Sequence, residues 1–121
     1  MAKILLIEDD KMMIELLATL LGLEGYQIAK LSDHMKADEM VAVIHQEKPD
    51  LILLDVFLSD LDGCEVLKSV RNDKELKSTR IIMTSGMDLR KDCIDQGADD
   101  FIMKPYVLEE LLSKIIHHMG E

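Results

Sequence analysis

The stretch that decides the fold is Leu51-Ile52-Leu53-Leu54-Asp55, followed by Val56-Phe57-Leu58 and the turn-forming residues 59–63. A continuous apolar run of this length, closed by a turn signal, indicates a strand that is buried on both faces. Such strands are typical of open parallel sheets, in which ligands bind at the carboxyl ends of the strands. We therefore expect Asp55 to lie where a buried strand meets solvent.

A second acidic cluster ends a similar apolar run near the start of the chain. Residues 4–7 read Ile-Leu-Leu-Ile and are followed by Glu8, Asp9 and Asp10. If the two strands are parallel, these carboxylates and Asp55 meet at one edge of the sheet. Taken alone, residues 8–10 are equally well explained as a solvated strand end that caps the first helix, because aspartate is a favoured N-cap.

Outward from these runs, short apolar segments alternate with segments of helical periodicity. We expect strands at 3–8, 26–31, 51–55, 80–84 and 99–103, and helices at 12–21, 37–46, 64–70, 88–96 and 107–118. Five strands, each followed by a helix, imply parallel strands with right-handed crossovers and hence a three-layer α/β fold. No internal repeat or linker interrupts the pattern, so we expect residues 1–121 to form one domain.

Composition limits the classes of function. The chain has 121 residues, of which 48% are apolar, enough for the core of one domain. Its net charge of −10 opposes direct contact with nucleic acid, which needs clustered lysines and arginines. No apolar stretch is long enough to span a bilayer and no signal peptide precedes the first strand, so we expect a cytoplasmic protein without membrane contact. Cys64 and Cys93 are far apart in sequence and lack a CxxC spacing, which predicts reduced, structural thiols.

Polar residues follow the ends of four expected strands. They are Glu8, Asp9 and Asp10 after the first, Asp55 after the third, Ser85 after the fourth and Lys104 after the fifth. With the motifs KILLIEDD, DLILLD, DLDG, IIMTSG and GADDFIMKP, the whole chain resembles the receiver domain of bacterial response regulators. The resemblance implies a flavodoxin-like, doubly wound (βα)5 sheet of order 2-1-3-4-5. It also implies phosphorylation of Asp55 by a histidine kinase or phosphotransfer protein in a two-component phosphorelay.

The resemblance further implies a Mg²⁺ ion at this edge. A carboxylate attacks phosphate poorly because both groups are anionic, and Mg²⁺, which prefers oxygen ligands, cancels that repulsion. By similarity to the family, Asp9 and Asp55 supply carboxylate oxygens, the backbone carbonyl of Phe57 supplies another, and Glu8 holds a coordinated water. Lys104 then provides a second positive charge.

Two residues match the switch positions of the family. The hydroxyl of Ser85 can donate to a phosphoryl oxygen, and Phe101 stands at the position of the mobile aromatic residue. In the family the bond that corresponds to Lys104–Pro105 is usually cis, although an ordinary helix start with proline in its first turn explains these two residues equally well. His117 and His118 are expected to be solvated helix-end residues rather than ligands.

The chain also departs from the family pattern. Ser59 stands where proline is common, and Lys104 follows Ser85 by 19 residues, about one helical turn fewer than usual, which predicts a shortened fourth helix. Residues 31–38 form a connection a few residues longer than usual. Four charged residues resemble the dimer-forming set of one large subfamily, but the short helix removes part of that surface, so we expect a monomer or a weak dimer. The four are Asp99, Asp100, Glu110 and Lys114.

Three functions are compatible with these observations. The first is a phosphoacceptor that catalyses only its own phosphorylation and dephosphorylation and acts on a downstream protein. The second is a docking module that is never phosphorylated. The third is a small phosphatase-like enzyme, which would want an acid two positions after Asp55, where Phe57 stands. The intact set of acidic residues, serine and lysine favours the first, while the kinase and the output cannot be read from the sequence.

Overall fold

The central feature of the computed structural model, which describes residues 2–31, 35–59 and 61–120, is a five-stranded parallel sheet. Its strands lie in the order β2-β1-β3-β6-β7, which confirms the predicted order 2-1-3-4-5 for the five main strands. They are β1 (Lys3–Ile7), β2 (Gln27–Leu31), β3 (Leu51–Asp55), β6 (Arg80–Ser85) and β7 (Asp100–Met103).

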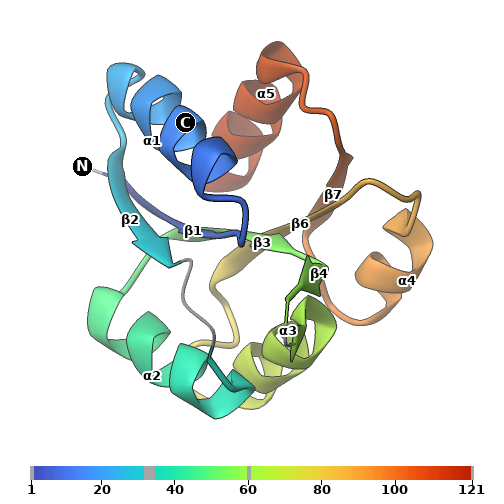
Figure 1. Ribbon diagram of the computed structural model, residues 1–121. Helices are drawn as coiled ribbons and strands as arrows, with labels where there is room; N and C mark the ends of the chain where they lie inside the picture. Colours follow the sequence, from blue (N-terminus) through green and yellow to red (C-terminus); the bar gives the residue numbers. More distant parts are fainter. Residues whose placement is uncertain (1, 32–34, 60, 121) are drawn as a thin grey trace.

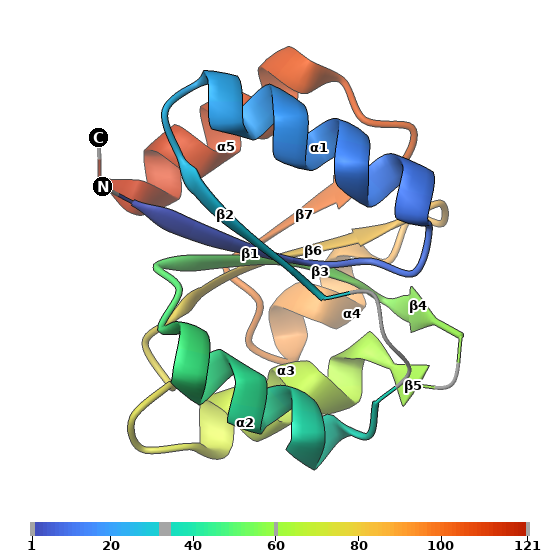
Figure 2. The ribbon, with the colours of Figure 1, turned by 60° about the vertical axis from the view of Figure 1, so that its left-hand side comes forward.

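Helices cover both faces of the sheet and complete three layers (Figure 1; Figure 2). One face carries α1 (Lys11–Leu23) and α5 (Leu108–Met119), and the other carries α2 (Ala37–Glu47), α3 (Gly63–Asn72) and α4 (Arg90–Asp95). The predicted three-layer α/β fold is therefore confirmed. The predicted bounds of these strands and helices agree with the observed ones to within two residues, and those of β3 match at both ends.

The core consists of two apolar layers, one on each side of the sheet. Strand β3 is buried along its whole length, which explains its unbroken run of apolar residues. Helix α1 buries Ile14, Leu17 and Leu21, whereas Met12 and Leu16 are exposed although they share the same helical periodicity. Apolar residues of α1 therefore occupy part of its exposed side as well as its buried face.

A short antiparallel ribbon, which the sequence did not predict, follows Asp55 directly. Strands β4 (Phe57–Leu58) and β5 (Leu61–Asp62) pair with each other and return the chain to the start of α3. Gly63, the first residue of α3, donates its backbone N–H to the carbonyl of Val56 at 2.7 Å. A Cβ atom on Gly63 would lie 2.1 Å from the backbone oxygen of Asp55. The close return of the chain beside Asp55 therefore requires glycine.

Helix α4 has only six residues, in agreement with the predicted shortening. Arg71, near the end of α3, holds the segment that follows α4 and the segment that precedes β6. Its guanidinium donates to the carbonyl oxygens of Gly97 and Thr79, both at 2.7 Å, and to Asp99 Oδ2 at 2.8 Å. Arg71 thus joins the segment before β6 to the segment before β7, at the edge of the sheet opposite to Asp55. The expected lengthening before α2 falls partly on residues 32–34, outside the described residues.

Replacing Gly63 with alanine should destabilise the protein by about 3 kcal/mol, because the added methyl group overlaps backbone atoms that cannot move aside easily. Gly22→Ala is the matched control, since nothing lies within 4 Å of a Cβ at that helical position. In the Gly22→Ala variant, alanine lowers the backbone entropy of the unfolded chain, which should stabilise the protein by roughly 0.5–1 kcal/mol. Urea unfolding of both variants measures the two effects, and changes of the same sign would contradict the assigned role of Gly63.

Candidate functional site

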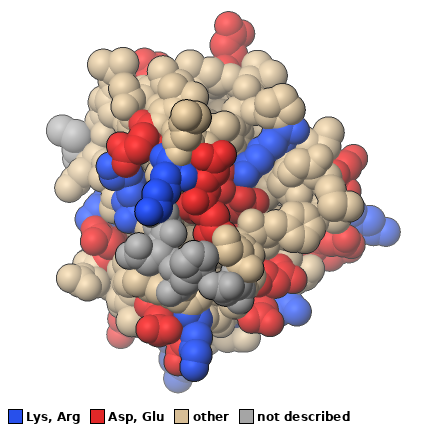
Figure 3. Space-filling model, in the orientation of Figure 1, with Lys and Arg blue, Asp and Glu red and all other residues tan. Residues whose placement is uncertain are grey.

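Three charged residues meet at the carboxyl edge of the sheet. Asp55 ends β3, Glu8 follows β1 and Lys104 follows β7. The Nζ atom of Lys104 donates to Glu8 Oε1 at 2.7 Å and to Asp55 Oδ2 at 2.8 Å. Glu8 is only 4% exposed and Asp55 only 7%. One lysine therefore joins two buried carboxylates from neighbouring strands, and acidic side chains gather in the middle of the face that Figure 3 shows.

The loops around these residues complete the edge. The backbone N–H of Phe57 donates to Asp55 Oδ1 at 3.3 Å, and the N–H of Asp9 donates to Glu8 Oε2 at 3.0 Å. The carboxylate of Asp9 itself accepts a hydrogen bond from the N–H of Ser59. Asp9 thus ties the loop after β1 to the ribbon that follows Asp55.

Asp10 has a different role from its acidic neighbours. Its carboxylate accepts a hydrogen bond from the N–H of Met13 at 3.1 Å and caps the N-terminus of α1. The helix-capping interpretation therefore holds for Asp10, which is exposed, while Glu8 is buried and faces Lys104.

Ser85 lies on β6, which pairs with β3, and Phe101 lies on β7, which pairs with β6. Ser85 is buried at the end of β6, and its Oγ accepts a hydrogen bond from the N–H of Met87 at 3.0 Å. The backbone N–H of Lys104 donates to the carbonyl of Ser85 at 2.8 Å, and the Lys104–Pro105 peptide bond is cis. Phe101 is buried in the layer beneath the sheet. Ser85 and Lys104 thus meet at the carboxyl ends of β6 and β7.

The charges of the site perturb one another. Burial and the hydrogen bond to Asp55 raise the pKa of Glu8 to about 7, although Lys104 opposes the change. Burial lowers the pKa of Lys104, but its hydrogen bonds to Asp55 and Glu8 outweigh burial and raise that pKa well above its ordinary value. Two carboxylates thus share one cation in a poorly solvated pocket, which favours a further positive charge there.

The donor set suits a hard cation, because Glu8, Asp9 and Asp55 all offer carboxylate oxygens. Within the described ranges, however, no three acidic, histidine or cysteine side chains are arranged to hold a metal ion. The carboxylates of Glu8 and Asp55 face Lys104, and that of Asp9 faces Ser59. The carboxylate oxygens of the site therefore suit Mg²⁺, and in this structure they accept hydrogen bonds from Lys104 and Ser59.

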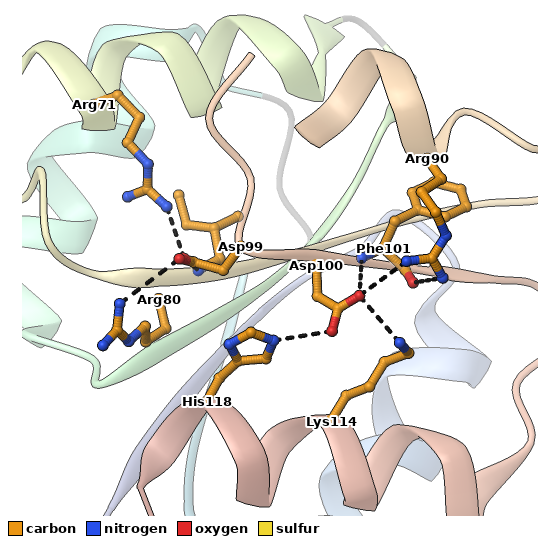
Figure 4. Close-up of polar contacts among 9 residues, drawn as sticks. Arg71, Arg80, Arg90, Asp99, Asp100, Phe101, Lys114 and His118 are labelled. Carbon is orange, nitrogen blue, oxygen red and sulfur yellow. Dashed lines mark hydrogen bonds and ion pairs between the residues drawn. The ribbon is translucent and has the colours of Figure 1, made fainter. Parts of the chain in front are cut away.

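His118 is not a solvated residue, so that prediction was wrong. Its Nε2 atom lies 2.9 Å from Asp100 Oδ2, and its side chain is only 15% exposed (Figure 4). His118 lies on the side of α5 that faces β7, where Asp100 begins the strand. His117, one residue earlier, is exposed as expected.

Asp100 is the centre of a network that sequence reasoning missed. Its Oδ1 atom lies 3.0 Å from Lys114 Nζ and 3.3 Å from Arg90 Nη1. Arg90 also donates to the carbonyl of Phe101 at 3.0 Å, and its guanidinium carbon lies 6.0 Å from the centroid of that ring. No local pattern signals these contacts, because they join residues of α4, β7 and α5 (Figure 4). The network holds the short α4 against Phe101.

Comparison with known proteins identifies the class of this domain. The family model of the response regulator receiver domain matches residues 4–116. The chain is 36% identical over 114 residues to the response regulator MprA of Mycobacterium leprae, covering 93% of this chain and 49% of that protein. It is 32% identical over 118 residues to the DNA-binding dual master transcriptional regulator RpaA of Synechocystis, covering 95% and 48%. The chain thus spans about half the length of these relatives.

Solved structures agree with this class. A putative response regulator from Chloroflexus aurantiacus has a TM-score of 0.88 at 26% identity and covers 99% of this chain and 98% of its own. A CheY-like receiver domain protein from Methanospirillum hungatei has a TM-score of 0.86 at 29% identity, covering 99% and 94%. The chain belongs to the response regulator receiver domain family of two-component systems. Among the described residues, no helix has both the length and the apolar character needed to cross a membrane.

The Asp100 network should make stability depend on pH. Burial opposes ionisation, but hydrogen bonds from His118, the Phe101 N–H and Lys114 lower the pKa of Asp100 to about 2. A carboxyl group whose pKa is lowered by folding stabilises the protein at pH values above its ordinary pKa near 4. This contribution is lost as the pH falls toward 2. Asp100→Asn should therefore cost about 1–2 kcal/mol at neutral pH, and this cost should shrink between pH 4 and pH 2.

Urea unfolding of the parent and the variant at several pH values measures that difference. Glu110→Gln, at an exposed position of the same helix layer, is the matched control and should show no such trend. A cost that is the same at pH 6 and pH 3 would mean that the carboxylate of Asp100 is not selectively stabilised by folding.

Proposed function

We propose that this domain is a phosphoacceptor switch, in which Asp55 receives a phosphoryl group from a histidine kinase or a phosphotransfer protein. The observation that carries the proposal is the buried Asp55 carboxylate at a parallel strand end, 2.8 Å from Lys104 Nζ. A structural ion pair would not need the second carboxylate, Glu8, which makes the pocket excessively negative. A pocket built to receive additional positive charge and a phosphoryl group accounts for both acids.

In the proposed reaction, a carboxylate oxygen of Asp55 attacks the phosphorus of a phosphohistidine, and the bond between phosphorus and the histidine nitrogen breaks. Such transfers pass through a loose transition state, so the protein acts mainly by positioning and by stabilising charge. Lys104 already lies beside the attacking carboxylate and would pair with the phosphoryl oxygens. Ser85 would donate its hydroxyl to another phosphoryl oxygen.

We propose Mg²⁺ as the ion of this site, held by Asp9, Asp55 and the backbone carbonyl of Phe57, with Glu8 positioning a coordinated water. The support is the oxygen donor set and the surplus of negative charge around Glu8 and Asp55. When bound, Mg²⁺ would offset the repulsion between the incoming phosphate and the acidic pocket.

An apolar surface of this domain lies next to the site, where a protein that donates the phosphoryl group could bind. A hollow of about 160 Å³ lies between α1 and the segment after Lys104, and it is lined by Met13, Leu16, Leu17, Leu20, Pro105, Tyr106 and Leu108. The exposed side chain of Met12 extends this surface. We propose that the donor contacts α1 here, which would bring its phosphohistidine to Asp55.

The output of the switch would pass through Ser85 and Phe101 to a downstream protein. We propose that the domain works in the cytoplasm, catalyses only its own phosphorylation and dephosphorylation, and makes no direct contact with nucleic acid, since its net charge is −10. The name of the Synechocystis relative states that it binds DNA. In that relative, DNA binding would need a part of the protein that this chain does not match.

The alternative is a docking module that is never phosphorylated. It would explain the fold but not the buried pair of acids around Lys104. Acetyl phosphate with Mg²⁺ separates the two, because a small phosphodonor needs no partner protein. The docking module would remain unmodified.

Phosphorylation should occur on Asp55 alone. Intact-mass measurement after treatment with acetyl phosphate should detect one added phosphoryl group that depends on Mg²⁺. Asp55→Asn should abolish it, because the amide is not a nucleophile, and Asp62→Asn is the matched control at a helix cap of the same loop. Persistence of the addition in Asp55→Asn would disprove the assignment.

The phosphorylated form should hydrolyse slowly for this family. Two side chains flank the approach of water, Phe57 with 57% of its surface exposed and Met87 with 59%. Neither can orient water by a hydrogen bond. Loss of one orienting group costs roughly tenfold or more in rate. The first-order decay of the phosphoprotein should therefore accelerate in the Phe57→Asn, Met87→Glu double variant, and equal decay in both proteins would refute this account.

Activation should not produce a tight symmetric dimer through α4, β7 and α5. Three of the four charged residues that such a dimer would share are already paired internally, because Asp99 lies 2.8 Å from Arg71 and Asp100 lies 3.0 Å from Lys114. The six-residue α4 offers little further surface. Sedimentation of the protein activated with beryllofluoride should show a monomer or a weak dimer, whereas a dimer of micromolar or tighter affinity would contradict this expectation.

A further inference from the structure

Three methionines among the described residues have strongly exposed side chains. Met12 is 84% exposed, Met87 59% and Met103 48%, whereas Met40 and Met83 are 2% and 0% exposed. Methionine usually fills gaps in apolar cores, where oxidants in solution do not reach it. A thioether that solvent reaches is readily oxidised to the sulfoxide, which enzymes can reduce again. The chain therefore carries both protected and oxidisable methionines.

Met87 lies in the loop after β6, beside the end of the strand that carries Asp55. Thr84 pairs with Asp55 in the sheet, and the carbonyl of Thr84 accepts a hydrogen bond from the N–H of Val56 at 2.9 Å. The next residue, Ser85, accepts a hydrogen bond at Oγ from the N–H of Met87 at 3.0 Å. The backbone of Met87 is thus held beside the hydroxyl that would bind a phosphoryl oxygen.

The surroundings of Met87 leave room for a larger side chain. Apart from its two chain neighbours, no atom lies within 4 Å of the place where a Cβ on Gly86 would stand. Because Met87 itself is mostly exposed, a further oxygen atom on its sulfur displaces no packed group. Oxidation of Met87 should therefore leave the fold intact, unlike oxidation of Met40 or Met83, which belong to the apolar core.

We propose that Met87 is a site of reversible oxidation and that its sulfoxide shortens the lifetime of the aspartyl phosphate at Asp55. This inference rests on the proposed phosphoacceptor role. The thioether is only a weak hydrogen-bond acceptor, so reduced Met87 cannot orient the water that attacks phosphorus. The sulfoxide oxygen is a strong acceptor and would hold that water. Oxidation therefore supplies the orienting group that Phe57 and reduced Met87 lack.

Hydrogen peroxide is the oxidant in this step. A lone pair of Met87 Sδ attacks one peroxide oxygen, the O–O bond breaks and hydroxide leaves. The transferred oxygen gives its proton to the hydroxide, so the products are the sulfoxide and one molecule of water. Sulfur loses two electrons and the peroxide gains them. A dithiol-dependent methionine sulfoxide reductase reverses the change, with two electrons and two protons from its thiols and release of the oxygen as water.

The expected effect on hydrolysis is moderate. One added hydrogen bond changes a rate by a factor of roughly two to ten. Lys104 and Ser85 keep their places, so the initial rate of labelling by acetyl phosphate should not change. Met12 and Met103 belong to other segments, the first turn of α1 and the end of β7, and their oxidation should not change the decay.

The first measurement locates the oxidation. Brief treatment of the purified full chain with hydrogen peroxide, followed by peptide mass mapping, should add one oxygen to Met87 well before Met40 or Met83. The urea-unfolded chain, in which every methionine is exposed, is the reference for intrinsic reactivity and should lose this selectivity. If Met87 of the folded chain is oxidised as slowly as Met83, the proposal is overturned.

The second measurement follows the decay of the phosphoprotein. Reduced and oxidised samples are labelled with acetyl phosphate and freed of the donor, and the first-order loss of the phosphoryl group is compared. We expect faster decay in the oxidised parent and a return to the original rate after treatment with sulfoxide reductase. Met87→Leu should show no acceleration on oxidation, while the matched control Met103→Leu should keep it. Met87→Gln, which presents a carbonyl oxygen at a similar reach, should decay faster than the reduced parent without peroxide.

Two outcomes of the decay measurement would overturn the proposal. They are equal decay in the reduced and oxidised parent, and the same acceleration in Met87→Leu as in the parent. If acetyl phosphate labels neither sample, the phosphoacceptor role itself fails and the effect on hydrolysis fails with it, while peptide mapping still decides whether Met87 is oxidised. Failure of the inference alone therefore differs from failure of the proposed function, because only the former leaves a labelled protein.

Discussion

The arrangement of this domain depends on the ion pairs that Lys104 makes with Asp55 and Glu8. Burial of two carboxylates is costly unless a cation and hydrogen bonds compensate for lost hydration. Lys104 reaches both acids because it follows β7, which pairs with β6, and β6 in turn pairs with β3. The parallel order of the strands is therefore a condition for the site, since only that order brings an acid from β1, an acid from β3 and the lysine after β7 to one edge.

The same constraint explains the local sequence around Asp55. The chain must leave the strand, keep the carboxylate of Asp55 inside, and return at once to α3. The β4–β5 ribbon makes this return, and Gly63 permits it because no side chain fits against the carbonyl of Asp55. The loop after Asp55 is thus shaped by backbone contacts, while Phe57 on the same loop remains exposed.

Sequence reasoning predicted what local periodicity and strand-end chemistry encode. The five main strands, the helices and the convergence of Glu8, Asp55 and Lys104 follow from apolar runs and from the motifs after them. The β4–β5 ribbon escaped prediction because strands of two residues have no measurable periodicity. The partners of Asp100, including His118, escaped because they join residues far apart in the chain. Such pairings depend on how the helices pack, which no single segment specifies.

The hydrogen bonds of Arg71 affect which changes in chain length this fold tolerates. A planar guanidinium with five donors can hold several acceptors in fixed directions, which a lysine cannot do. Because it binds Gly97 and Asp99 just before β7 and Thr79 just before β6, the start of each strand is fixed without any contribution from α4. The segment between those anchors is therefore free to gain or lose a helical turn while the register of the sheet stays the same. A receiver of this kind could diversify its choice of partner through α4 and still keep the geometry on which the Asp55 edge depends.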